Sequence, residues 1–263
     1  MHEIHRENRI VSRSERPVHP QPHQTGLTQQ AKDTVLRYLG RRGQAVPPQL
    51  DALVEECLGE IRSLQPRHTY RIFDLERTPL QDKPGTSQDE ADPHQDEPTP
   101  ETLFLRNTQV TLFGQGIGRH LKGCRRAVLL AVTLGVDADN LIRRREHTDM
   151  TRALVLDACA TQQIESACDA IEQHVCREAL SNGLTATSRY SPGYGDLPLD
   201  IQPRLLAALD AERKIGLTCT QNLILLPRKS VTAIIGLGEN LNHGRKHQRC
   251  DLCGLKETCP YGI

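Results

Sequence analysis

The sequence predicts an α+β protein in which a β-sheet is covered by a long helix. Residues 149–181 keep one apolar face over several turns, as a long amphipathic helix does. Helices and strands are interleaved irregularly, without the strict alternation that is typical of a parallel sheet. Short β-rich segments occur at residues 70–75, 104–112, 215–219 and 231–237.

The first 80 residues divide into a tail and a helical part. Residues 1–27 hold three prolines and four histidines among scattered charges, which predicts a disordered tail. Residues 28–80 are expected to form the N-terminal helical part of the folded module. Thr28 can cap a first helix that ends before Gly40, and Pro48 opens a second with apolar residues at three- and four-residue spacing.

An acidic, proline-rich stretch follows. Residues 81–102 include four prolines and six acidic side chains between positions 81 and 100, and Ala91 is the apolar side chain among them. Such a stretch cannot bury enough surface to offset the entropy of ordering it. We therefore expect a disordered insert here, and a folded core over residues 103–240.

Within that core, residues 120–132 are expected to form a buried helix. The glycines of residues 114–118 (GQGIG) resemble a nucleotide-binding loop only in part, and a plain turn is the favoured interpretation. Thr148 or Asp149 can cap the long helix, and Gly183 follows its end. A shorter helix is expected at residues 204–211.

Three acidic side chains lie on the long helix with a spacing of four and three residues: Glu165, Asp169 and Glu172. Carboxylates at this spacing share a face of the helix. They could serve as acid–base groups, but a solvated helix face is the favoured interpretation.

Composition argues against several classes of function. Lysine plus arginine equals aspartate plus glutamate at 33 each, and aromatic residues are 3% with no tryptophan, so we expect no nucleic-acid partner. The most apolar run, residues 127–136, has about half of the ~20 residues that a bilayer span needs, so no membrane association is expected. Residues 1–13 are charged and lack the apolar segment of a signal peptide. Nine cysteines, an odd number, then indicate reduced thiols or metal ligands in a cytoplasmic protein.

The most distinctive stretch is RYSPGYGDLPLDIQ at residues 189–202. Arg189 offers a planar guanidinium that can bind a carboxylate through two bonds. Ser191 and Gly193 expose backbone groups at a tight turn, and the ring of Tyr194 can attract a cation such as a sulfonium. These features suit a zwitterionic amino-acid ligand with an added positive centre. The alternative is a Pro-Gly surface turn with ordinary aromatic packing.

This stretch resembles the S-adenosylmethionine-binding R-x-x-P-G-Y motif of the activation (reactivation) domain of vitamin B12-dependent methionine synthase. In its longer form it is similar to short, separately encoded relatives of that domain. The resemblance extends over residues 28–75 and 103–263. Further segments that carry it, in order, are residues 35–40, 120–124, 133–135, 149–157, 215–218 and 226–236.

The resemblance implies a twisted, mostly antiparallel sheet covered by long helices. It implies that Arg189 holds the carboxylate of S-adenosylmethionine, that Ser191 and Gly193 contact the ligand mainly through backbone, and that Tyr194 lies near the ligand and the corrinoid. One departure is that Ile234 and the isoleucine after it stand where the full-length domain has aromatic residues. No acidic ligand contact and no catalytic residue are assigned.

The implied function is that of an activation subunit in a methionine synthase (methyltransferase) system. Cob(II)alamin, carried by a cobalamin-binding methionine synthase subunit, is methylated reductively by S-adenosylmethionine and an electron from a donor such as flavodoxin or ferredoxin. The chain is too short to be a complete methyltransferase, so cobalamin belongs to the partner.

Residues 241–263 form a cysteine-rich tail. Cys250, Cys253 and Cys259 have a spacing that suits zinc or an iron–sulfur cluster, and the alternatives are an unmetallated thiol pair or an ordinary tail. If these cysteines carry the function, the protein is a metal-dependent electron-transfer adaptor for a corrinoid methyltransferase, or a scaffold with a zinc knuckle. Candidates for a fourth ligand are His243, His247, Cys219 and an external ligand.

Overall fold

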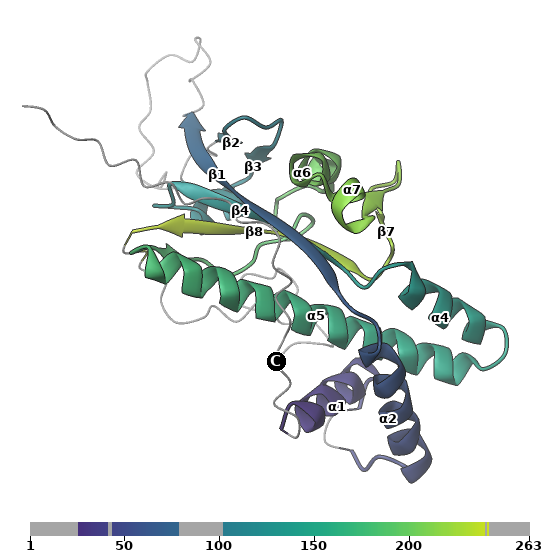
Figure 1. Ribbon diagram of the computed structural model, residues 1–263. Helices are drawn as coiled ribbons and strands as arrows, with labels where there is room; N and C mark the ends of the chain where they lie inside the picture. Colours follow the sequence, from purple (N-terminus) through teal and green to yellow (C-terminus); the bar gives the residue numbers. More distant parts are fainter. Residues whose placement is uncertain (1–25, 42–43, 79–101, 240, 242–263) are drawn as a thin grey trace, which may run out of the picture.

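The computed structural model describes residues 26–41, 44–78, 102–239 and 241 (Figure 1). The helices are α1 (Gly26–Tyr38), α2 (Pro48–Arg62), α3 (Gln115–His120), α4 (Val136–Glu146), α5 (Met150–Ser181), α6 (Gln202–Leu209) and α7 (Ala211–Ile215), with a 3₁₀ turn at Leu199–Ile201. The strands are β1 (Arg67–Thr78), β2 (Thr102–Leu105), β3 (Thr111–Phe113), β4 (Arg126–Thr133), β5 (Thr185–Ala186), β6 (Thr218–Cys219), β7 (Leu225–Leu226) and β8 (Ser230–Gly238).

Six strands form one sheet in the order β3-β2-β1-β4-β8-β5, and every neighbouring pair is antiparallel. The three longest strands, β1, β4 and β8, are neighbours, with β1 paired to β4 from Arg67↔Thr133 to Asp74↔Arg126. Strands β6 and β7 form a separate hairpin. The expected α+β class with a mostly antiparallel sheet is therefore confirmed.

Helices cover both faces of the sheet. Helix α5 crosses one face, and α1 and α2 pack near one of its ends, whereas α6 and α7 lie on the opposite face (Figure 1). Strand β4 contributes to both cores, because Val128 and Leu130 point toward α5 while Ala127 and Leu129 point toward α6. All four side chains are fully buried.

This double burial explains one wrong prediction. The helix expected at residues 120–132 is instead the end of α3 followed by strand β4. A strand that is covered on both faces has a continuous apolar sequence, and such a run cannot be distinguished from a buried helix by its periodicity.

Other elements agree with the sequence more closely. Helix α5 begins after Asp149, whose side chain accepts a hydrogen bond from the Arg152 amide at 2.9 Å, and Gly183 follows its end with φ of +72°. The strand expected at residues 104–112 is two strands joined by a turn, and helix α4 was not predicted.

Some predictions fall outside the described residues. These are the tail up to residue 25, the insert between residues 79 and 101, and the cysteine-rich segment from residue 242 onward. In the part of the chain that the structure describes, no helix combines the length and apolar character needed to cross a bilayer.

Candidate functional site

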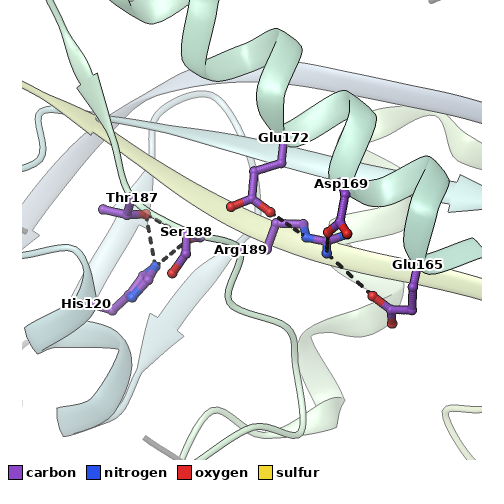
Figure 2. A network of polar contacts seen from close by, with 7 residues as sticks. All are labelled: His120, Glu165, Asp169, Glu172, Thr187, Ser188 and Arg189. Carbon is purple, nitrogen blue, oxygen red and sulfur yellow. Dashed lines mark hydrogen bonds and ion pairs between the residues drawn. The ribbon is translucent and has the colours of Figure 1, made fainter. Parts of the chain in front are cut away.

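The segment that carries the R-x-x-P-G-Y motif leaves α5 and runs beside strand β8. Tyr190 and Ile234 exchange two backbone hydrogen bonds, of 2.9 and 2.8 Å. Side chains alternate between faces along such an extended segment. Tyr190 is accordingly buried in the core beneath α6, whereas Arg189 points toward α5 (Figure 2).

Arg189 is enclosed by carboxylates of α5 (Figure 2). Its Nη2 atom lies 2.6 Å from Asp169 and 3.4 Å from Glu165, and its Nε atom lies 2.8 Å from Glu172. The Arg189 side chain is only 6% exposed. The favoured interpretation of a solvated face holds for Asp169, which is exposed, whereas Glu165 and Glu172 are half-buried beside Arg189. The spacing of the three acids indicated that they share a helix face, but the sequence did not indicate which cation pairs with them.

One atom of this guanidinium has no partner. Nη1 of Arg189 is buried and has no hydrogen-bond acceptor among the described residues. Leaving a buried donor unsatisfied costs about 1–3 kcal/mol, and more when the group is charged. The carboxylates thus hold the guanidinium through Nε and Nη2 and leave Nη1 as a donor that lacks an acceptor.

His120, at the end of α3, holds the backbone just before Arg189. Its Nε2 atom lies 2.8 Å from the Ser188 carbonyl oxygen and 2.9 Å from the Thr187 hydroxyl (Figure 2). Because a carbonyl oxygen only accepts hydrogen bonds, Nε2 must carry a proton and donate. Thr187 in turn accepts the Gly236 amide at 2.8 Å, so this contact ties α3 and β8 to the motif.

The tight turn has the predicted conformation. The Tyr194 amide donates to the Ser191 carbonyl at 3.1 Å, and Gly193 has φ of +88° between them, as a type II turn requires. The Gly193 amide donates to the Leu197 carbonyl at 2.8 Å. The Gly193 amide and the Ser191 carbonyl are therefore both already hydrogen-bonded within the loop.

The two tyrosines of the motif have different environments. Tyr190 is 8% exposed, its hydroxyl donates to the Tyr194 carbonyl at 3.2 Å, and burial raises its pKa. Tyr194 is 55% exposed. Of the two rings, Tyr194 is therefore the one that can face a ligand or a partner protein.

Asp196 attaches the loop to the start of α3. Its carboxylate oxygens accept the Gly116 amide at 3.0 and 3.1 Å. A Cβ atom at Gly114 or Gly116 would lie 2.7 Å from the Asp196 carboxylate, so a larger residue there would displace that side chain. Gly114 and Gly116 thus allow close packing, but the plain turn favoured from the sequence is instead the start of helix α3, which begins at Gln115.

Two further expectations concern the isoleucines that replace aromatic residues of the full-length domain and the cysteines predicted to bind a metal. Ile234 and Ile235 are fully buried and belong to opposite cores, so they are not exposed to a ligand. Cys250, Cys253 and Cys259 lie outside the described residues, while Cys219 is half-buried in β6. Among the residues that the structure describes, no group of three His, Cys, Asp or Glu side chains is placed to hold a metal ion.

Comparison with known proteins gives a structural match. No protein-family model matches the chain, and no curated protein sequence matches it. The crystal structure of the MetH reactivation domain bound to AdoHcy is similar, with a TM-score of 0.52 and 16% sequence identity. The match covers 79% of this chain and 74% of that one. The chain therefore has the fold of this reactivation domain.

Proposed function

We propose that this protein is an activation subunit of a cobalamin-dependent methionine synthase, and that it binds S-adenosylmethionine at Arg189 and Tyr194. Two findings of different kinds support this proposal. The sequence at residues 189–194 resembles the R-x-x-P-G-Y motif, and the fold matches a reactivation domain whose structure holds AdoHcy.

The observation that carries the proposal is the unsatisfied Nη1 atom of Arg189. A ligand carboxylate would supply the acceptor that this buried donor lacks. Glu172 and Asp169 bind the other nitrogen atoms, so they fix the plane of the guanidinium before the ligand arrives. Such preorganisation reduces the entropy lost on binding.

Tyr194 would contact the other end of the amino-acid part of the ligand. An aromatic face attracts a cation within about 6 Å of its centre, and the sulfonium of S-adenosylmethionine is such a cation. Because Tyr194 is exposed, a sulfonium methyl beside it would remain accessible to a partner protein.

When the partner's corrinoid is docked, it would supply the cobalt centre that takes the methyl group, and one electron would come from a donor such as flavodoxin or ferredoxin. The methyl group would leave its bonding pair on sulfur, giving S-adenosylhomocysteine, and the two electrons of the new bond to cobalt would be the one of cob(II)alamin and the one from the donor. This chain would contribute orientation: Arg189 holds the carboxylate and Tyr194 the sulfonium. We assign no acid–base residue, because methyl transfer from a sulfonium needs no proton transfer.

The test is calorimetric titration of S-adenosylmethionine into the purified full-length protein. Tyr194→Ala should weaken binding about 2- to 5-fold, because a cation–π contact at an exposed ring contributes about 0.5–1 kcal/mol. Phe113→Ala is a matched control, since Phe113 is an equally exposed aromatic residue (50%) on the β3 edge of the sheet. Arg189→Lys should weaken binding further, because an ammonium cannot reproduce the fork of donors.

A folded wild-type protein that does not bind S-adenosylmethionine at millimolar concentration would overturn the proposal. Equal weakening by Tyr194→Ala and Phe113→Ala would overturn the placement of the site. With a cob(II)alamin-loaded partner and a one-electron donor, the expected product is methylcobalamin, detected by its absorption spectrum.

A further inference from the structure

A hollow lies on the opposite face of the sheet from the Arg189 side chain. It is an open cavity of about 470 Å³ between β1, the β2–β3 turn and α6. Arg71 and Phe73 of β1 form its floor, on the side of the strand that faces α6. The proposed S-adenosylmethionine site does not include any residue of this cavity.

The cavity is rich in positive charge. Its lining contains three arginines, Arg71, Arg106 and Arg204, and a single carboxylate, Asp74. Three positive charges against one negative leave two positive charges in excess. Asp74 is also shared, because it lies 3.6 Å from Arg126 and 4.0 Å from Arg106.

Two of the arginines are held in position by the protein. The Arg71 guanidinium lies 5.2 Å from the centre of the Phe73 ring, and its Nη1 atom donates to the Ala208 carbonyl at 3.1 Å. The Nε atom of Arg106 lies 2.6 Å from Glu76. Each guanidinium therefore retains donors that are not used by these contacts and that have a fixed orientation.

The third arginine differs from these two. Arg204, on the first turn of α6, is exposed and makes no ion pair with the described residues. Arg71 likewise forms no ion pair with these residues, whereas Arg106 pairs with Glu76. An anion that enters the cavity would supply the counter-charge that Arg71 and Arg204 lack.

We propose that this cavity binds a small organic phosphate. A phosphate monoester carries close to two negative charges at neutral pH, which equals the excess charge of the lining, and its oxygens match the donors of guanidinium groups. The volume is within the range of about 300–1,000 Å³ that is typical of small-ligand pockets. Phe73 is 8% exposed and lies under Arg71, so no aromatic face is open for stacking a base. A short polar phosphate ester therefore fits better than a nucleotide.

The side chains of the β2–β3 turn would complete the site. Thr108 and Gln109 line the cavity, and the Gln109 amide can donate to an anion. The turn is shaped by the Thr108 hydroxyl, which donates to the Leu105 carbonyl at 2.8 Å and accepts the Val110 amide at 3.0 Å. Asn107, with φ of +62°, completes this tight turn.

The experiment is titration of the full-length protein with pyrophosphate and with glycerol 3-phosphate at low salt, followed by calorimetry and by backbone amide NMR shifts. Arg204→Ala should weaken binding at least about 10-fold, as expected for the loss of a charge-assisted bond. Arg213→Ala is the matched control, because Arg213 is an exposed arginine of neighbouring α7 that pairs with Asp210. The largest amide shifts are expected at residues 106–109.

The proposal would be overturned if Arg204→Ala and Arg213→Ala weakened phosphate binding equally. It would also be overturned if the amides of residues 106–109 did not shift on phosphate addition. Tighter binding of citrate than of both phosphate compounds would overturn the assignment to phosphate. Arg204→Ala should leave S-adenosylmethionine binding unchanged, so failure here is distinguishable from failure of the proposed function.

Discussion

Arginine side chains have opposite environments on the two faces of the sheet. On the α5 face, Arg189 is 6% exposed and three carboxylates surround it. On the α6 face, Arg71, Arg106 and Arg204 line an open cavity with one carboxylate. The first arrangement removes a cation from water and compensates it within the chain, whereas the second leaves cations in contact with solvent.

This difference teaches how each site would recognise a ligand. A buried guanidinium must be paired, so its orientation is set in the folded protein and only its remaining donor can select a ligand. Exposed arginines are stabilised by water, so they need no partner within the chain and can bind an anion from solvent. We expect ligand binding on the α6 face to depend more strongly on ionic strength than binding on the α5 face.

The largest expected effect concerns stability. Arg189→Ala should lower the free energy of unfolding by about 2–3 kcal/mol, because it leaves partly buried carboxylates without their cation. Arg204→Ala should change it by less than about 0.5 kcal/mol, as most exposed substitutions do. Urea denaturation monitored by circular dichroism measures both. Similar losses for the two variants would show that the faces do not differ in this way.

The next largest effect is the dependence of ligand binding on ionic strength, which should differ between the two proposed sites. Raising the ionic strength from 0.05 to 0.5 M is expected to weaken phosphate binding about 10-fold, since the arginines of the α6 face are exposed and screened. S-adenosylmethionine binding should change less than about 3-fold, because the Arg189 contact is buried. Calorimetry at the two salt concentrations provides the measurement, and an equal response of both ligands would contradict the comparison.

A smaller effect is expected at His120, the residue that positions Arg189. His120→Ala should weaken S-adenosylmethionine binding about 2- to 10-fold, the value of one hydrogen bond, and His120→Gln should restore part of it by donating from its amide. Binding to the wild type should not depend on protonation of His120, because Nε2 donates in both the neutral and the charged ring. His174→Ala on α5 is the control. A loss of wild-type affinity on acidification that His120→Gln abolishes would contradict this positioning role.

The smallest effect concerns pH and the packing of α5 on β1. Burial, with His174 nearby, lowers the pKa of His68, so the folded protein binds a proton there less readily than the unfolded chain does. Stability should therefore be retained above about pH 6.5 and should fall as the pH decreases below it. His68→Gln should make the free energy of unfolding less dependent on pH in this range. An unchanged slope between pH 5 and pH 7 would contradict the assignment.

Much of the fold was predictable where local rules and tertiary context agree. The cap at Asp149, the apolar face of residues 149–181 and the glycine at position 183 all favour the same helix, and the structure contains it. Pro192 and Gly193 likewise predicted the turn that is found. The order of strands in the sheet could not be predicted, because it depends on pairings between residues far apart in the chain, such as Arg67 with Thr133.

The class of fold, the long helix and the turn that follows Arg189 were predictable from the sequence, since each depends on local periodicity or on the conformational freedom of glycine. That β4 is a strand, and that Glu165, Asp169 and Glu172 enclose Arg189, is seen only in the folded protein. Both outcomes depend on burial between distant segments. A continuous apolar run has no helical or strand period, and a carboxylate on a helix face does not reveal which distant cation will approach it. The cysteines at 250, 253 and 259 remain a prediction of a metal site.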